Sequence, residues 1–145
     1  MTTLRKFIEA KNFFRIPLKR LATGHYMFKA KVNGVSGDFI LDTGASTSCV
    51  GFAYSAHFSL IQEDSEIKAA GAGAIDMPTL LSRKNTFSIK QWSLKNMDFV
   101  LFDLSHVNEA LTQTGENPIH GIIGADFLKT HRAVIDYGRN CVYIK

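Results

Sequence analysis

Phe39-Ile40-Leu41-Asp42-Thr43-Gly44 is the stretch of this sequence that decides how the whole chain should be interpreted. Its apolar half, Phe39–Leu41, is typical of the end of a buried strand. The Asp-Thr-Gly half predicts a tight turn, because Asp and Gly both favour turns. A plain surface turn is one interpretation of such a triplet. A carboxylate fixed at the end of a buried strand also suits acid–base activation of water by a pair of aspartates.

The residues before this stretch predict a β-hairpin. Apolar residues alternate with lysines between His25 and Val32, as in a strand with one buried face. Asn33-Gly34 follows, and this pair favours a type I′ turn, which requires positive φ at both central residues. The return strand runs from Gly37 to Leu41. Asp42 should therefore lie directly after the second arm of the hairpin.

The rest of the chain predicts short strands and a few short helices. The other expected strands are Phe14–Leu18, Thr86–Ile89, Met97–Phe102, Ile119–Ile123, Ala133–Ile135 and Cys141–Ile144. The expected helices are Phe52–His57, Ser105–Leu111 with Ser105 as its N-cap, and Ala125–Thr130. Short strands separated by closely spaced, Gly-marked turns indicate a mainly β fold that is closed or partly closed.

Length and composition indicate one globular domain, with residues 1–13 as an N-terminal extension and residues 14–145 as the folded unit. The chain has 145 residues, of which 46% are apolar and 21% charged, enough to bury a core without disulfides. We interpret Cys49 and Cys141 as reduced core residues, with a single bridge between them as the alternative. Charges interrupt Met1–Lys11, and no window is apolar enough to span a membrane, so we expect a cytoplasmic protein.

The net charge of +4 raises the question of nucleic acid binding. The basic residues are most frequent in the N-terminal third and form no compact cluster along the sequence. Between Tyr26 and Lys31 the aromatic residues and the lysines alternate, so they fall on opposite faces of a strand, which disfavours base stacking beside phosphate contacts. The five histidines lack metal-ligand spacing and no nucleotide-binding glycine motif is present. We therefore expect no nucleic acid, metal or cofactor.

Two further segments bear on the Asp42 turn. Ile122-Ile123-Gly124 is a second apolar strand end that finishes on glycine. Residues 60–81 read as two strand-like arms around the tip Ala69-Ala70-Gly71-Ala72-Gly73-Ala74. Such a tip has no bulky side chain, so it should be mobile. After Asp42, the small residues Ala45-Ser46-Thr47-Ser48 carry hydroxyl groups that could hydrogen-bond a carboxylate.

Taken in order, Phe39–Ser46 and Gly121–Leu128 resemble the two signature segments of the retropepsin-like aspartic proteases, a resemblance that covers roughly residues 14–145. It implies a small closed β-barrel with one or two short helices, active as a symmetric homodimer on peptide or protein substrates. Asp42 would be the catalytic residue. Thr43 would brace the partner's active-site loop, and Gly44 would allow the two backbones to approach closely.

The resemblance also assigns supporting roles. Ala45 and Ser46 would complete the active-site loop, and Ile122, Ile123 and Gly124 would lie beneath it. The tip residues would form the flap that closes over substrate: Ala70, Gly71, Ala72 and Gly73. The segment 84–118 is longer than in a minimal viral enzyme, and we interpret it as a surface excursion, with a reshaped substrate cleft as the alternative.

The chemistry of two carboxyl groups independently favours a dimer. Amide hydrolysis by water needs one carboxylate as base and one carboxylic acid to polarise the carbonyl. No other Asp in this chain is followed by Thr-Gly. A two-fold axis would supply the second carboxyl, because a symmetric interface places identical residues opposite each other. A non-catalytic module of the same fold that binds peptide or assembles a complex is the alternative.

Overall fold

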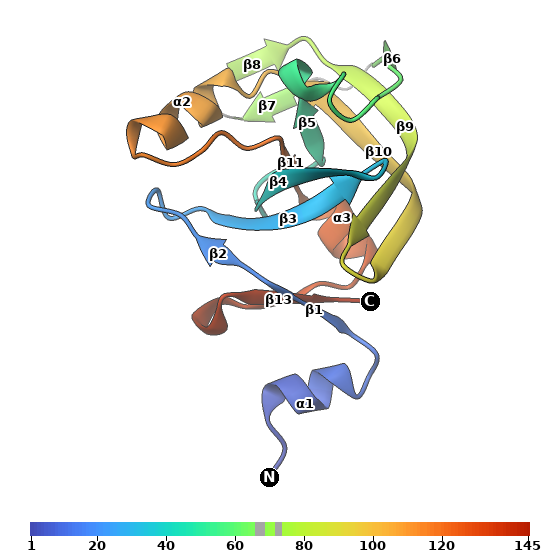
Figure 1. Cartoon of the computed structure of the whole chain (residues 1–145), viewed down its shortest axis with the longest axis vertical. Helices are drawn as coiled ribbons and strands as arrows, with labels where there is room; N and C mark the ends of the chain where they lie inside the picture. The colour runs from blue at the N-terminus through green and yellow to red at the C-terminus, as the bar shows by residue number, and fades with distance from the viewer. Residues whose placement is uncertain (66–68, 72–73) are drawn as a thin grey trace.

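Six strands close into a barrel in the computed structural model, which describes residues 1–65, 69–71 and 74–145. Each strand is hydrogen-bonded to the next, and the last returns to the first. Around the ring they are β3 (Tyr26–Val32), β4 (Val35–Leu41), β11 (Gly121–Ile123), β5 (Cys49–Gly51), β10 (Trp92–Phe102) and β9 (Leu80–Ile89). The predicted mainly β fold with a closed barrel is confirmed (Figure 1).

Smaller elements surround the barrel. The remaining strands are β1 (Phe14–Pro17), β2 (Lys19–Arg20), β6 (Glu63–Asp64), β7 (Ala69–Gly71), β8 (Ala74–Met77), β12 (Val134–Asp136) and β13 (Cys141–Ile144). The helices are α1 (Leu4–Glu9), α2 (Ser105–Gln113) and α3 (Ala125–Thr130), with 3-10 turns η1 (Phe52–Tyr54) and η2 (Tyr137–Arg139). Strands β2 and β6 extend the barrel sheet at its two ends, and β7 pairs with β8.

The hairpin that leads to Asp42 forms as the sequence predicts. Asn33 and Gly34 have φ values of 51° and 82°, the positive values that a type I′ turn requires. Val32 then pairs with Val35, and the register continues to Tyr26 opposite Leu41. The side chains of β3 alternate between buried and exposed from Phe28 onward. The second arm is thereby held in one register up to its last residue.

Aromatic side chains fill the barrel around Phe39, which is fully buried. Its ring lies 5.7 to 6.4 Å from the rings of Phe28, Phe58, Phe87 and Phe99, measured between centroids. Aromatic pairs at such distances add to the free energy gained by burying their surface. The strand that ends at Asp42 therefore passes through the centre of the core, which fixes its position.

Three expectations about local structure were wrong. Residues 84–102 are not a surface excursion, because β9 and β10 form barrel wall and bury Phe87 and Phe99. The helix expected at Phe52–His57 shortens to the 3-10 turn η1. Ser105 is the first residue of α2 rather than its cap, and its N–H donates to the Asp103 carboxylate at 2.9 Å. A side chain two residues upstream thus replaces the expected cap.

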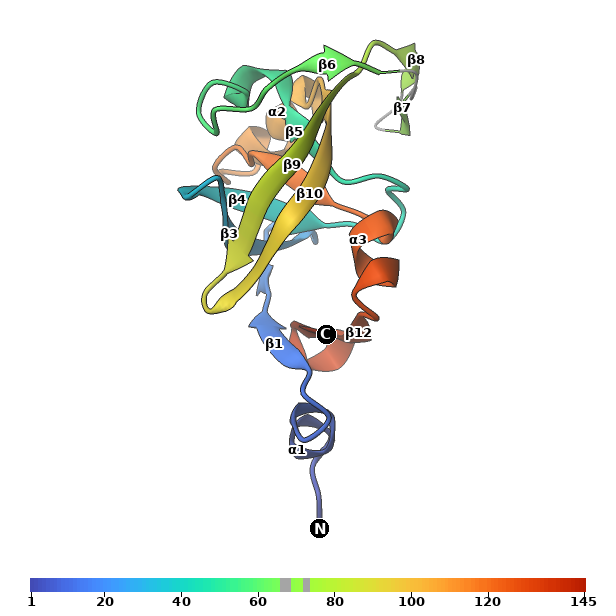
Figure 2. The ribbon, with the colours of Figure 1, turned by 90° about the vertical axis from the view of Figure 1, so that its right-hand side faces the viewer.

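A three-stranded sheet lies outside the barrel and joins the two ends of the chain. Its order is β1-β13-β12, and β1 runs antiparallel to β13 with Phe14 opposite Ile144. Helix α1 packs on this sheet through Ile8, which contacts a cluster containing Cys141 and Tyr143. Figures 1 and 2 both show α1 beyond this sheet, at the far end of the molecule from the β7–β8 hairpin.

Both cysteines are buried free thiols, which confirms the prediction that they are reduced core residues. Cys49 lies at the start of β5, and Cys141 lies at the start of β13. In the described part of the chain, no helix is both long enough and apolar enough to cross a membrane.

Two stacked imidazoles hydrogen-bond to the backbone of β4, the strand that leads to the Asp42 turn. The rings of His57 and His120 lie 5.0 Å apart. The Asp38 N–H donates to Nδ1 of His120 at 3.0 Å, so this nitrogen carries no proton and the imidazole is neutral. Burial, and then the neighbouring His57, lower the pKa of His120 below its usual 6.5, an effect that Asp38 opposes and Lys29 adds to.

We therefore expect the free energy of unfolding to fall as the pH drops. A base whose pKa is lowered on folding stabilises the fold fully above its unfolded pKa, about 6.5 for His120. That contribution is lost as the pH falls through the folded pKa. Urea denaturation of the wild type and of His120→Asn, at about pH 7.5 and about pH 5, measures it. The difference between the two proteins should change with pH, and a constant difference would contradict the assignment.

Candidate active site

Asp42 lies where β4 leaves the barrel beside β11. These two strands run parallel, with Leu41 opposite Ile123, and the Asp42 N–H continues the ladder by donating to the Ile123 carbonyl at 2.9 Å. The Asp42 carboxylate accepts a hydrogen bond from the Gly44 N–H at 2.8 Å and is exposed to solvent. One oxygen is thus oriented by the turn, and the group remains accessible to a ligand.

The strand end Ile122-Ile123-Gly124 packs against the Asp42 turn. The Ala125 N–H donates to the Ala45 carbonyl at 2.7 Å. A Cβ added to Gly124 would lie 2.5 Å from that same carbonyl oxygen, so only glycine fits there. Ile123 is fully buried in the barrel core, whereas Ile122 belongs to a second apolar cluster on the other side of the sheet. The three residues expected beneath the loop therefore lie next to it.

A buried serine links the turn to α3. Ser48 Oγ donates to the Asp126 carboxylate at 2.7 Å and accepts from the Gly124 N–H at 3.0 Å. The Ser48 N–H also donates to both Asp126 oxygens at 3.0 Å. The Ser48 side chain and backbone thus occupy the Asp126 carboxylate. A hydroxyl group of the run after Asp42 therefore does bind a carboxylate, but Ser48 binds the carboxylate of Asp126 and not that of Asp42.

We expect Ser48→Ala to destabilise the protein by about 1–3 kcal/mol, because it leaves the buried Gly124 N–H without an acceptor and removes one donor to Asp126. Thermal unfolding measures the loss. Ser46→Ala is the matched control, since Ser46 is exposed, and its unfolding temperature should equal that of the wild type. Equal effects of the two substitutions would contradict the role of Ser48.

A pocket of about 340 Å³ opens beside the catalytic candidate. Asp42 and Thr43 form part of its wall, and the other lining residues are Leu18, Gly24, His25, Tyr26, Leu41, Ile135 and Tyr137. The rings of Tyr26 and Tyr137 lie 5.1 Å apart. Burial raises the pKa of Tyr26, and its hydrogen bond with Tyr137 raises it further. The Tyr26 phenol therefore stays neutral near pH 7.

Sequence reasoning did not identify the part of the pocket that comes from Ile135 and Tyr137. These residues lie more than 90 positions after Asp42, and no motif marks them. The alternation in β3 predicted which face of the strand carries Tyr26, but not that this face lies next to Asp42. Only the pairing of distant strands brings these side chains together.

Cys49 lies seven residues after Asp42, and its thiol is inactive. Burial raises the pKa of Cys49 to about 12, and the carboxylates of Asp126 and Asp42 act in the same direction. A neutral, buried thiol is a poor nucleophile. Cys49 therefore does not compete with the Asp42 carboxyl group as a reactive group at this site.

The segment that the sequence predicts as a flap contains β7 and β8. These strands run antiparallel, with Ala69 opposite Met77 and Gly71 opposite Ala74. Ala70 and Gly71 lie in β7, whereas Ala72 and Gly73 lie outside the described residues. Among the residues that the structure describes, no group of three His, Cys, Asp or Glu side chains could hold a metal ion.

Residues 28–127 match the model of the aspartyl protease family. A retropepsin-like aspartic protease from Rickettsia conorii has a similar structure, with 18% sequence identity, a TM-score of 0.58 and 91% of each chain covered. EIAV protease in complex with the inhibitor HBY-793 is 20% identical, with a TM-score of 0.52, over 72% of this chain and 85% of that one.

The retroviral protease-like domain of Ddi1 from Leishmania major is also similar, at 17% identity with a TM-score of 0.54, over 82% of this chain and 86% of that one. No curated protein matches the sequence. The family match confirms the resemblance noted in the sequence, and the structural matches confirm the fold.

Proposed function

We propose that this chain, which belongs to the aspartyl protease family, is an aspartic endopeptidase whose active site forms between two copies of the chain. The observation that carries the proposal is the exposed Asp42 carboxylate at the end of β4, oriented by the Gly44 N–H. The catalytic unit would comprise residues 14–145, and residues 1–13 would be an extension. Each copy supplies one carboxyl group.

The two Asp42 side chains would share one proton, because two carboxyl groups in contact cannot both ionise. The ionised group removes a proton from water, and the water oxygen attacks the peptide carbonyl carbon. The protonated group donates its proton to the carbonyl oxygen. When the resulting tetrahedral diol collapses, one hydroxyl group returns a proton to the Asp42 that donated one. The C–N bond breaks, and the amine nitrogen takes up the proton that the other Asp42 removed from water. These proton transfers between the carboxyl groups, the water and the substrate need no metal or cofactor.

The position of Asp126 argues against a dyad within one chain. Its carboxylate accepts three hydrogen bonds from Ser48 and one from the Phe127 N–H, and Asp103 accepts from Ser105. Both groups are engaged in local structure. Asp42 therefore needs its second carboxyl from elsewhere, and a two-fold axis places an identical group opposite it.

Strand β12 offers an exposed apolar surface that a second copy of the chain would cover. In the described part of the chain its one sheet neighbour is β13, and Val134 and Ile135 are 39% and 37% exposed. Ile135 shares the pocket with Asp42 and Thr43, so a partner that covers β12 would lie next to the proposed dyad. In that arrangement Thr43 would brace the partner's loop, and the β7–β8 hairpin would act as the flap over substrate.

Peptidase activity should therefore depend on protein concentration. We expect specific activity on a complex peptide library to rise as monomers associate, in parallel with the dimer fraction measured by sedimentation. Ile135→Asp should shift both curves to higher concentration, because it places a charge in an apolar contact. Ile61→Asp is the control, since Ile61 is 78% exposed and does not line the pocket. A fully active monomer would refute the shared site.

The alternative, a non-catalytic module that binds peptides or assembles a complex, predicts a different result in the same assay. Peptides from the library would be retained by the dimer but recovered at their original masses. Cleavage products at any protein concentration would exclude this alternative.

A further inference from the structure

Charge is distributed unevenly between the barrel and the sheet that joins the two chain ends. We define the terminal module as residues 1–18 and 131–145, which contain α1, β1, β12 and β13. It has seven basic and two acidic side chains, a net charge of +5, whereas the other 112 residues have a net charge of −1. Its basic residues are Arg5, Lys6, Lys11, Arg15, Arg132, Arg139 and Lys145.

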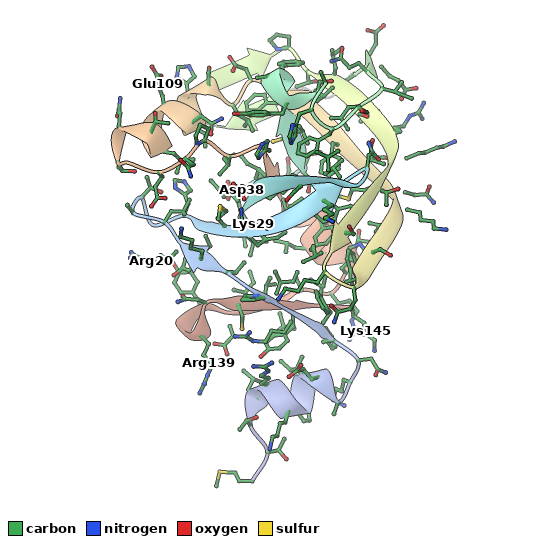
Figure 3. All side chains as sticks on the ribbon, viewed as in Figure 1. Arg20, Lys29, Asp38, Glu109, Arg139 and Lys145 are labelled. Carbon is green, nitrogen blue, oxygen red and sulfur yellow. The ribbon has the colours of Figure 1, made fainter. Side chains whose placement is uncertain are left out.

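Folding thus brings the basic residues of the two chain ends together. Figure 3 shows Arg139 and Lys145 at the α1 end of the molecule, with Asp38 and Glu109 in the barrel part. Among the described residues, two basic side chains of the terminal module have a carboxylate within ion-pair distance, Arg5 with Glu9 and Arg139 with Asp136. The module therefore presents a net positive surface.

The same end of the molecule exposes apolar side chains. Leu4 and Phe7 are 52% and 54% exposed, and their spacing of three residues places them side by side on α1. Ile8 anchors the helix to β13, so the other two side chains are held outward. The ammonium group of Lys11 lies 5.0 Å from the centre of the Phe7 ring. An apolar surface bordered by cations is the pattern of a segment that lies in a membrane interface.

We propose that the terminal module docks on an anionic lipid bilayer, with Leu4 and Phe7 inserted at the level of the head groups and Lys6 and Lys11 against the lipid phosphates. Both forces are needed, because a few basic residues or two apolar side chains alone bind a bilayer only weakly. Nucleic acid fits the surface less well. The exposed aliphatic Leu4 offers nothing to a phosphate backbone, and the Phe13 ring is covered by Arg132 and Lys145.

The orientation would keep the proposed flap accessible. Helix α1 and the β7–β8 hairpin lie at opposite ends of the molecule (Figures 1 and 2). A protein bound through α1 would therefore direct this hairpin away from the lipid. Docking does not depend on catalysis, so it can be tested whether or not the chain cleaves peptides.

Co-sedimentation of the full chain with vesicles tests the proposal. The probes are phosphatidylcholine vesicles with and without about one third phosphatidylglycerol. We expect binding to the anionic vesicles that weakens with added salt, and little binding to the neutral ones. Leu4→Ser/Phe7→Ser should abolish it, and Lys6→Ala/Lys11→Ala should weaken it by roughly 30-fold. All four side chains are exposed, and circular dichroism should confirm that the variants are folded.

Matched substitutions on the barrel are the controls. Ile61→Ser and Lys31→Ala/Lys95→Ala also replace exposed side chains and should bind vesicles like the wild type. Equal binding to neutral vesicles, or binding that survives Leu4→Ser/Phe7→Ser, would overturn the proposal. So would a single-stranded RNA oligonucleotide that displaces the protein from anionic vesicles, since the surface would then be a nucleic acid site.

Discussion

Asp42→Asn should lower the rate of peptide cleavage by roughly 10³-fold or more, because it removes both the base and the acid from a shared dyad. The fold should remain, since the asparagine oxygen can still accept the hydrogen bond that the Asp42 carboxylate receives from the Gly44 N–H at 2.8 Å. Product formation from a peptide library, followed by mass spectrometry, measures the rate. Sedimentation checks that the variant still associates.

Asp103→Asn is a close control for this substitution. The Asp103 carboxylate also follows a barrel strand and accepts a hydrogen bond from the N–H two residues later, that of Ser105, at 2.9 Å. It is likewise exposed, but it does not line the pocket. Asp103→Asn should cleave peptides at the wild-type rate. Retained cleavage in Asp42→Asn would show that the catalytic group lies elsewhere.

Gly124→Ala should cause a large loss of stability, about 3 kcal/mol, at the upper end of the usual cost of overpacking. The added Cβ would lie 2.5 Å from the Ala45 oxygen and 3.1 Å from its carbonyl carbon. Both are backbone atoms, which cannot rotate away as a side chain would. The loop must shift, so activity should fall together with stability. Thermal unfolding should show a decrease in Tm of roughly 10 °C.

Gly138→Ala separates the clash from the general effect of replacing a glycine. A Cβ at Gly138 would meet no atom within 4 Å, so this variant should unfold at the wild-type temperature or slightly above it. If Gly124→Ala were as stable as Gly138→Ala, the close approach of the two loops would not be a constraint on the fold.

Local sequence patterns predicted the hairpin and parts of β9, β10 and β11, because these depend on neighbouring residues, but they did not indicate β5. The alternation in β3 and the Asn33-Gly34 turn are fixed by side-chain period and by φ preference. The 84–118 segment was misinterpreted because β9 and β10 are long and partly polar, and their burial depends on strands far away in sequence. The Ser48–Asp126 interaction joins residues 78 positions apart, which no local pattern encodes.

For this chain, sequence alone determined that a carboxylate follows a buried strand, that a second Ile-Ile-Gly strand end accompanies it, and that one copy has a single Asp-Thr-Gly. These are properties of short segments, which propensity and spacing control. Tertiary structure decided which groups surround Asp42. Closure of the barrel brings Gly124 against Ala45, and the sheet outside the barrel places Tyr137 against Tyr26. Pairing of the chain ends gathers the basic residues at α1. Such contacts follow from the summed packing of the whole chain, so no segment specifies them by itself.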